Sequence, residues 1–394
     1  MKVLVLGAGR MGYGAVFDLV NNSPDVESVT VADMDLSKAK AVADAVDPGR
    51  VTPREIDASD VAAATELMRG HDSVISCVNY WYNVALSKAA IEVGANFCDL
   101  GGNNYVVDEQ LALDPEAKAA GISIIPDCGL APGMVSILAM HGARQFDELS
   151  EIHIRVGGLP QEPQPPLNYQ LVFSVEGLIN EYIEVARVIR NGEILEVPSM
   201  TEIEDLEFEG FPPLEAFQTS GGTSTLPDSF LAKVQELDYK TIRYAGHCDK
   251  FKTMMDLGLC SGHEVAVDNG QLTADNAVPV KIAPRKLFGR LLEMYLPHDE
   301  PDYVLVRLEF VGKLATRPSS LATLRYDIVD RFDEATGLSA MMRTTAFPAS
   351  IIAQMMARGD VLVRGATPQE KAIDPERFMR ELTRRNINVA VSEL

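Results

Sequence analysis

The residues with the clearest chemical purpose form the run Gly7-Ala8-Gly9-Arg10-Met11-Gly12 near the start of the chain. The run follows an apolar segment and opens a segment with helical periodicity. Glycines at this spacing allow a tight turn, a close approach of backbone to a pyrophosphate, and close packing of helix on strand. The free N–H groups at the helix start then face the phosphates. The run therefore predicts a dinucleotide site, contacted by Gly7, Gly9, Arg10, Met11 and Gly12.

An acidic residue stands where such a site needs one. Asp33 ends the next apolar segment, roughly 20 residues beyond Gly12. A carboxylate there accepts hydrogen bonds from the adenosine ribose hydroxyls and repels a 2′-phosphate, and neither Met34 nor Asp35 offers a compensating cation. We therefore predict NAD in preference to NADP as the cofactor. The alternative is that Asp33 only caps the following helix and that the glycines form an ordinary turn.

Two further segments end predicted strands at the edge where a nicotinamide should lie. Residues 79–83 are rich in aromatic side chains and contain the only tryptophan, and residues 99–102 end in two glycines. The aromatic side chains would either shield a nicotinamide from water or pack a domain interface. From these segments we expect cofactor contacts by Asn79, Tyr80, Asp99 and Gly101.

The elements that must position these residues alternate between strand and helix over the first 130 residues. Strands are predicted at 2–6, 28–32, 72–76, 96–99 and 122–125, and helices at 11–21, 36–45, 60–68, 83–92 and 108–120. This alternation is typical of βαβ units and of a doubly wound parallel sheet with helices on both faces. The fold class is therefore α/β, with a Rossmann domain over residues 1–148.

From about residue 149 the sequence pattern changes. Residues 150–156 alternate polar and apolar, which is typical of a sheet with one buried face. Asn191-Gly192 and Asn269-Gly270 predict tight hairpins. Further strands are predicted at 303–311, 321–330 and 338–346, and helices at 247–258 and 284–295. We assign 149–346 to an α+β domain on a mostly antiparallel sheet, and expect the tail 347–394 to pack back on the first domain.

Composition narrows the classes of partner. The chain of 394 residues has 57 acidic against 35 basic residues, a net charge of −22, which argues against nucleic acid or an anionic membrane as a partner. No apolar run approaches the roughly 20 residues of a membrane span. The five cysteines are scattered and the histidines share no ligand spacing, so no metal site is expected. With no export signal recognised, we expect a cytoplasmic protein.

Four unusual strings accompany the glycine-rich run: PDCGLAPGM (126–134), FSVEGL (173–178), LEAFQTSGGTSTL (214–226) and YKTIRYAGH (239–247). Together they resemble the saccharopine dehydrogenase-like family, and within it the lysine 6-dehydrogenase branch, over nearly the whole chain. The resemblance implies NAD-dependent oxidative deamination of the ε-amine of L-lysine to allysine, which cyclises to a piperideine carboxylate. It also implies a second domain that binds the amino-acid substrate and forms homo-oligomers.

Two other functions are compatible with these features. One is a saccharopine or carboxynorspermidine dehydrogenase, which acts on a secondary amine and needs a further cation for an extra carboxylate. The other is a non-catalytic protein that senses NAD, because a fold alone never fixes a function.

An amino-acid substrate requires a cation for its carboxylate and an anion for its α-ammonium group. Arg243 is the predicted carboxylate partner, since a guanidinium binds carboxylates in a bidentate way; otherwise it is an exposed sheet residue. Glu176 is the predicted ammonium partner, buried in a string of small and apolar residues; otherwise it is a first-turn residue of a helix capped by Ser174. Further substrate contacts are expected from Thr219, Ser224 and Lys240, although strand alternation places Lys240 on the opposite face from Arg243.

Hydride leaves only from a neutral amine, so a base must take a proton from the ε-ammonium group. Asp127 follows a predicted strand on the nicotinamide side, and His247 begins a helix beside the Arg243 strand. Either residue could instead cap a helix. We expect Asp127 to be the base, because a carboxylate also stabilises the iminium product, and keep His247 as the second catalytic candidate.

Overall fold

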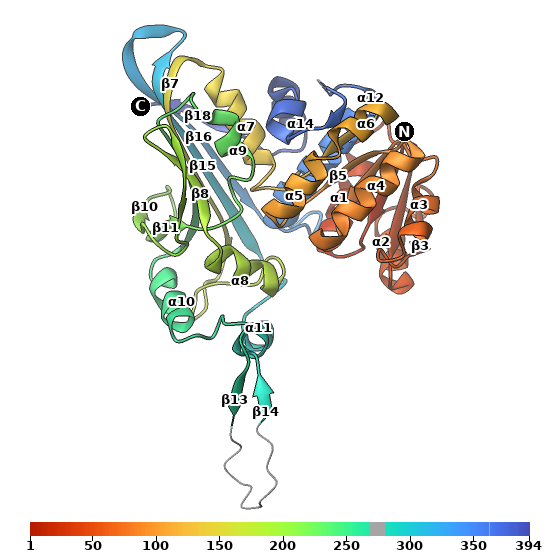
Figure 1. The fold of residues 1–394 in the computed structure, drawn as a ribbon, viewed down its shortest axis with the longest axis horizontal. Helices are drawn as coiled ribbons and strands as arrows, with labels where there is room; N and C mark the ends of the chain where they lie inside the picture. The colour runs from red at the N-terminus through yellow and green to blue at the C-terminus, as the bar shows by residue number, and fades with distance from the viewer. Residues whose placement is uncertain (268–279, 362) are drawn as a thin grey trace, which may run out of the picture.

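The computed structural model describes residues 1–267, 280–361 and 363–394. It contains two large sheets that lie side by side, one covered by helices α1 to α6 and the other facing it across α7 and α12 (Figure 1). The first sheet is entirely parallel and has the order β17-β6-β5-β4-β1-β2-β3. This confirms the predicted Rossmann-like sheet.

The predicted strands of this sheet are β1 (Lys2–Leu6), β2 (Ser28–Asp33), β4 (Ser73–Ser76), β5 (Asn96–Asp99) and β6 (Ser123–Ile125). The edge strand β3 (Val51–Glu55) was not predicted, because its sequence VTPRE is mostly exposed and carries a proline that only an edge tolerates. The helices that alternate with these strands are α1 (Arg10–Asn21), α2 (Leu36–Val46), α3 (Val61–Met68) and α4 (Asn83–Val93).

The helix predicted over 108–120 is wrong as a single element. The structure has α5 (Asn104–Leu111) and α6 (Asp114–Ala120) in its place. Pro115 stands in the first turn of α6, where its missing N–H is harmless, whereas in the interior of one longer helix it would break a hydrogen bond.

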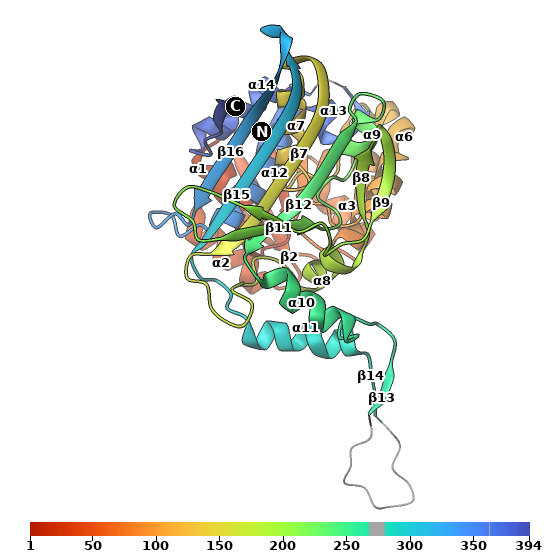
Figure 2. The ribbon, with the colours of Figure 1, turned by 90° about the vertical axis from the view of Figure 1, so that its left-hand side faces the viewer.

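The second sheet is mixed and mostly antiparallel, as predicted, with the order β10-β11-β12-β7-β15-β16-β18 (Figure 2). Its long strands are β7 (Phe146–Pro160), β15 (Asp302–Leu314) and β16 (Arg317–Arg331), and β12 (Glu236–Tyr244) runs parallel to β7. The shorter strands are β10 (Glu204–Leu206), β11 (Leu214–Gln218) and β18 (Ala390–Glu393). The predicted Asn191-Gly192 turn joins β8 (Ala186–Arg190) to β9 (Glu193–Val197).

The strand predicted over 338–346 is wrong, because the buried helix α12 (Ala340–Arg358) begins there. Ser339 caps it: its hydroxyl accepts a hydrogen bond from the Met342 amide at 3.0 Å. This helix packs on α1, β4 and β5 and also on β15 and β16, so it joins the two sheets. A Cβ on Gly14 of α1 would lie 2.9 Å from the Ala346 Cβ, which shows how closely α1 and α12 approach.

The C-terminal residues contact both sheets. Strand β17 (Gly365–Ala366) extends the parallel sheet beside β6, whereas β18 pairs with β16 of the second sheet. Between them lie α13 (Gln369–Ala372) and α14 (Pro375–Arg384). Arg385 donates through Nε to Asp18 of α1 at 2.6 Å, and both side chains are buried, so this ion pair fixes the tail on the first sheet.

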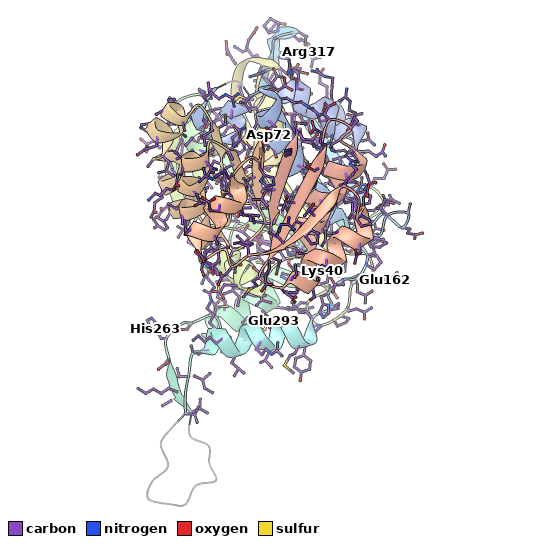
Figure 3. The ribbon with its side chains drawn as sticks, turned by 90° about the vertical axis from the view of Figure 1, so that its right-hand side faces the viewer. Lys40, Asp72, Glu162, His263, Glu293 and Arg317 are labelled. Carbon is purple, nitrogen blue, oxygen red and sulfur yellow. The ribbon has the colours of Figure 1, made fainter. Side chains whose placement is uncertain are left out.

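The remaining helices are α7 (Met134–Ala143), α8 (Val175–Ile183), α9 (Leu226–Phe230), α10 (His247–Asp256) and α11 (Pro284–Tyr295). The paired strands β13 (Val265–Val267) and β14 (Val280–Ile282) extend away from the body below α11 (Figures 1 and 2). The predicted Asn269-Gly270 turn lies outside the described residues. In Figure 3, Glu293 of α11 and His263 lie at this end, and Arg317 lies at the opposite end of the molecule. Within the described ranges, none of the helices has the length and apolar character needed to span a bilayer.

Candidate active site

A cavity of about 410 Å³ lies between the carboxyl ends of the parallel strands and one face of the second sheet. Carboxyl ends of strands in open α/β sheets are where cofactors and substrates bind. The segments that follow strands of the first sheet contribute Met11, Asn79, Tyr80, Gly101 and Asp127 to its wall. Helix α8 and strand β12 contribute side chains from the opposite side, among them Glu181, Tyr239, Thr241 and Arg243.

The glycine-rich loop has the geometry that a dinucleotide requires. Gly7 has φ +99°, in a region that favours glycine, and a Cβ on Gly12 would overlap the Gly7 carbonyl oxygen. Gly9 caps α1 without a side chain, so the first N–H groups of the helix stay open to a phosphate. The loop therefore fits a pyrophosphate.

Asp33 lies beside this loop at the end of β2. Its Oδ2 accepts from the Ala8 amide at 2.8 Å and its Oδ1 accepts from the Asp35 amide at 2.9 Å. The helix that follows is capped by Asp35, not by Asp33. The carboxylate is thus held next to the place where the adenosine ribose of a dinucleotide would lie.

The side chain of Arg10 points away from the glycine-rich loop, toward Leu171 and Asp299. Its Nη1 is 3.1 Å from Asp299 Oδ1 and 3.4 Å from the Leu171 carbonyl oxygen. The backbone of Arg10 remains at the helix start. Any cofactor contact by this residue therefore involves its N–H unless the guanidinium leaves Asp299.

The expected nicotinamide residues divide into two groups. Asn79, Tyr80 and Gly101 line the cavity, whereas Asp99 is buried behind it. Asp99 Oδ1 accepts from the amides of Gly101 and Asp127 at 2.8 and 3.2 Å, and its Oδ2 accepts from Gln110 at 2.7 Å. Asp99 thus supports the cavity wall from behind.

Asp127 reaches the cavity from the loop after β6. Its backbone has φ +60°, an unusual conformation for aspartate that turns the side chain toward the second half. Its Oδ2 accepts a hydrogen bond from the Ser224 hydroxyl, and its Oδ1 has no partner among the described residues. The absence of a side chain on Gly101 makes room for it, since a Cβ there would overlap Asp127 Oδ1.

The protonation of Asp127 is shifted toward neutral pH. Burial, and next the nearby Asp99 carboxylate, raise the pKa of Asp127 to about 7. Helix α7 is capped by Gly133 without a side-chain hydrogen bond, so Asp127 does not serve as its cap. A carboxyl group with a pKa near 7 can take up and release a proton under neutral conditions.

Arg243 supplies the positive charge of the cavity. Strand alternation directs Thr241 and Arg243 into the cavity, whereas Lys240 points to the other face and donates to Glu204 Oε2 at 2.6 Å. The Arg243 guanidinium stacks on the Tyr169 ring at 4.8 Å. Its Nη1 donates to the Ile242 carbonyl at 2.9 Å, and its Nη2 lies 4.0 Å from Glu181 Oε2, beyond hydrogen-bond distance.

Glu176 is not buried as expected. It lies in the first turn of α8, which Ser174 caps, and it pairs with Arg285 at 2.6 Å with most of its side chain exposed. The apolar residues next to Glu176 in the sequence are buried on the other face of α8. The Glu176 carboxylate therefore lies at the rim of the cavity.

Two carboxylates at the C-terminal end of α8 were missed from the sequence. Glu181 Oε1 accepts from the Thr241 hydroxyl at 2.6 Å, and Thr241 is 2.7 Å from the Thr219 hydroxyl. Glu184 also lines the cavity, and burial raises its pKa. Glu184 follows Glu181 by three residues, and this spacing was the one signal available.

His247 does not line the cavity. It is buried behind Arg243, with Nε2 3.1 Å from the Tyr182 hydroxyl and Nδ1 3.0 Å from the Leu167 carbonyl oxygen. Burial, and next the positive charge of Arg243, lower the pKa of His247 to about 3. The structure thus brings Asp127 and Arg243 to one cavity. Ser224 contacts this cavity only through its hydrogen bond to Asp127, and Thr219, His247 and Lys240 do not line it.

The charges around the cavity are unequal. Of the described residues that line it, Arg243 alone is cationic, and four are acidic: Asp127, Glu176, Glu181 and Glu184. Such a lining favours a ligand with one carboxylate and at least one ammonium group. The described residues contain no cluster of three or more His, Cys, Asp or Glu side chains placed to hold a metal ion.

Two family models match this chain. Residues 3–125 match the family model for the saccharopine dehydrogenase NADP binding domain, and residues 129–387 match that for the saccharopine dehydrogenase C-terminal domain. The chain belongs to the saccharopine dehydrogenase family. This confirms the family predicted from the sequence strings.

Two relatives illustrate the range of the family. The chain is 26% identical to a saccharopine dehydrogenase [NADP(+), L-glutamate-forming] of Pyricularia oryzae, across 73% of this chain and 62% of that protein. It is 25% identical to the carboxynorspermidine synthase of Vibrio cholerae, across 39% of this chain and 42% of that one. The chain thus spans less than two thirds of either relative.

Two solved structures share the fold. The apo saccharopine dehydrogenase (L-Glu forming) of Saccharomyces cerevisiae superposes with a TM-score of 0.79 at 21% identity, over all of this chain and 99% of that one. A homospermidine synthase of Legionella pneumophila in complex with NAD gives 0.68 at 12% identity, over all of this chain and 91% of that one. At these sequence identities, both similarities show a shared fold and nothing more.

Proposed function

We propose that this protein is an NAD-dependent oxidoreductase that deaminates the ε-amine of L-lysine. The observation that carries the proposal is the charge of the cavity. Among the described lining residues Arg243 is the one cation, and it shares the lining with the carboxylates of Asp127, Glu181 and Glu184, while Glu176 at the rim is paired with Arg285. L-Lysine has one carboxylate, which Arg243 can bind, and two ammonium groups, which two of these carboxylates can bind.

The positions of the charged groups support the same substrate. Arg243 Nη2 and Glu181 Oε2 present a cation and an anion 4.0 Å apart. The carboxylate and α-ammonium of an amino acid are separated by a single carbon, so one head group can contact both residues. The ε-amine then extends toward Asp127 at the first-domain wall.

Asp127 takes the role of base in this proposal. Bound NAD supplies the hydride acceptor. Asp127 accepts a proton from the ε-ammonium group and passes it to water, hydride leaves the ε-carbon, and the carboxylate restored in this way stabilises the positive iminium. Water adds to the iminium and ammonia leaves, so lysine, NAD⁺ and water give allysine, NADH, ammonium and one proton.

The names of the relatives favour a second candidate, a secondary-amine oxidoreductase such as a saccharopine dehydrogenase. Saccharopine carries more than one carboxylate. The described lining residues offer Arg243 as a carboxylate partner but no second cation, and further carboxylates would face Glu181 and Glu184. The charge balance therefore favours lysine over saccharopine.

NAD is proposed over NADP because of Asp33. Its carboxylate is held at the end of β2 by the Ala8 amide, where it suits two ribose hydroxyls and repels a 2′-phosphate. The matching family model and the Pyricularia relative are both described with NADP, so the cofactor must be tested directly.

A panel of amines assayed with NAD and with NADP tests the proposal. The panel contains L-lysine, L-ornithine, cadaverine and saccharopine, and NADH formation is followed by absorbance. We expect turnover of L-lysine with NAD to exceed that of every other pair. Faster turnover of saccharopine would support the second candidate, and no turnover of any amine would favour a non-catalytic NAD-binding protein.

A further inference from the structure

A buried series of hydrogen bonds lies behind Arg243 and ends at a backbone carbonyl. Arg243 Nε donates to the Tyr182 hydroxyl oxygen at 2.8 Å. The Tyr182 hydroxyl is 3.1 Å from His247 Nε2, and His247 Nδ1 is 3.0 Å from the Leu167 carbonyl oxygen. We call these four residues, which come from β12, α8, α10 and the loop after β7, the tyrosine–histidine network.

The direction of each bond follows from its chemistry. The Leu167 carbonyl can only accept, so His247 Nδ1 must carry a proton. The low pKa of His247, about 3, keeps the ring neutral, so Nε2 is an acceptor. The Tyr182 hydroxyl therefore donates to Nε2 and accepts from Arg243 Nε. Each group then has one role, and the network permits one arrangement of protons.

The network is also fixed by packing. Arg243, Tyr182 and His247 are each at most 3% exposed. Tyr182 lies edge-on to Phe251, with ring centroids 4.7 Å apart, and Tyr169 covers the guanidinium. An arginine held in this way has little rotamer freedom left to lose when a ligand binds.

The anchored guanidinium keeps one group for a ligand. Nε is engaged by Tyr182 and Nη1 by the Ile242 carbonyl, so Nη2 is the nitrogen that remains near Glu181 at the cavity. Release of Nε would let the planar group rotate and change the direction of Nη2. The orientation of the cation therefore depends on Tyr182, and that of Tyr182 depends on His247.

We propose that Tyr182 and His247 are positioning residues that orient Arg243 toward the substrate carboxylate, and that they set affinity for carboxylate-bearing amines without taking part in proton or hydride transfer. The inference rests on the proposed function, because it takes Arg243 as the carboxylate partner. It gives His247 a role other than catalytic base.

Kinetics of Tyr182→Phe test the positioning role. The variant keeps the ring and removes the oxygen that accepts from Arg243 Nε. We expect KM for L-lysine to rise about 10-fold, with kcat within about 3-fold of wild type and KM for cadaverine unchanged, since cadaverine has no carboxylate.

In an Arg243→Ala background, Tyr182→Phe should produce no further change, because its effect passes through the guanidinium. His247→Gln, which retains an acceptor, should have a smaller effect than His247→Phe.

Tyr326→Phe is the matched control. Tyr326 is buried and its hydroxyl is 2.8 Å from His141 Nδ1, so the variant removes a second tyrosine–histidine hydrogen bond outside the cavity. Its KM for L-lysine should equal that of wild type. Equal changes for lysine and cadaverine in Tyr182→Phe, or an added loss in the Arg243→Ala background, would overturn the proposal and leave Tyr182 as a structural residue.

A measurement without substrate separates this inference from the proposed function. In protein labelled with ¹⁵N-histidine, the His247 signals, assigned by their loss in His247→Gln, should show a neutral ring protonated at Nδ1 at pH 6. The Nε2 resonance should shift in Tyr182→Phe and stay unchanged in Tyr326→Phe. A protonated imidazolium at pH 6, or an Nε2 resonance indifferent to Tyr182, would overturn the network. If wild type oxidises no amine, the proposed function fails and the NMR result alone decides the network.

Discussion

Replacement of Asp127 by asparagine is the most informative single change in this molecule. The variant keeps the size of the side chain and an oxygen that can accept from Ser224. It removes the group that takes the proton from the amine. Loss of a positioned general base typically lowers rates by about 10²- to 10⁴-fold, so we expect kcat for L-lysine to fall within that range.

The pH dependence gives a sharper expectation. The pKa of Asp127 is raised to about 7, and only the ionised form can accept a proton. Activity of the wild type should therefore fall as the pH drops below about 7, reaching roughly 1% of its plateau two pH values lower. In Asp127→Asn this break should vanish, and only the gradual rise from deprotonation of the substrate amine, whose pKa is about 10.4, should remain.

Stability should change in the opposite sense. The folded-state pKa of Asp127 lies above its ordinary value of 3.8, so the fold favours the protonated group. That contribution is fully present below pH 3.8 and is lost as the pH rises through about 7. At ~1.4 kcal/mol per pKa unit, the loss amounts to at most ~4 kcal/mol. Asp127→Asn should therefore gain stability over wild type as the pH rises from 4 to 8.

Stopped-flow NADH absorbance from pH 5 to 9 and urea unfolding at pH 4, 6 and 8 measure both effects. NAD affinity, read from protein fluorescence, serves as the control and should stay within about 3-fold of wild type. A variant that retains near-normal kcat and the break near pH 7 would refute Asp127 as the base. A stability difference that does not depend on pH would refute the burial of an ionisable carboxyl at this place.

Three other variants test separate parts of the account. Asp33→Ser should weaken NAD binding and raise the relative kcat/KM with NADP, because it removes a ribose acceptor and a repulsive charge; an unchanged NAD to NADP ratio would contradict the assignment. Arg243→Ala should lower kcat/KM for L-lysine by about 100-fold or more, with a far smaller loss for cadaverine, since a substrate carboxylate would be left without its partner; equal losses would mean that Arg243 supports the fold. Gly14→Leu should lower the free energy of unfolding by about 1–3 kcal/mol or more, seen as a fall in Tm, because its Cβ would already lie 2.9 Å from Ala346.

Local sequence signals predicted most of the first half of the fold. The glycine spacing, the apolar strands and Asp33 are contiguous features whose meaning does not depend on distant residues. The edge strand β3 lacked such a signal, because an exposed edge imposes little hydrophobic pattern. The strand predicted over 338–346 failed because Thr344 and Thr345 favour strands locally, whereas burial of α12 between the two sheets requires a helix there.

The cavity was predictable only where one element determined the direction of a side chain. Strand alternation separated Arg243 from Lys240, and the position of Asp127 after β6 brought its side chain to the cavity. Glu181 could not be chosen over Glu176 from the sequence, because the choice depends on which face of α8 meets β12. The sequence places His247 four residues after Arg243. Its burial behind the guanidinium, however, depends on tertiary packing, which the sequence pattern does not reveal.

The central claim, oxidation of lysine at its ε-carbon, is tested most directly by following labelled nitrogen. L-Lysine labelled with ¹⁵N at the ε position is incubated with the protein and NAD, and ammonium and products are analysed by mass spectrometry. The account predicts one ¹⁵N-ammonium for each NADH and a piperideine carboxylate without the label. Release of unlabelled ammonium from the α position, or formation of NADH only when saccharopine is supplied, would contradict it.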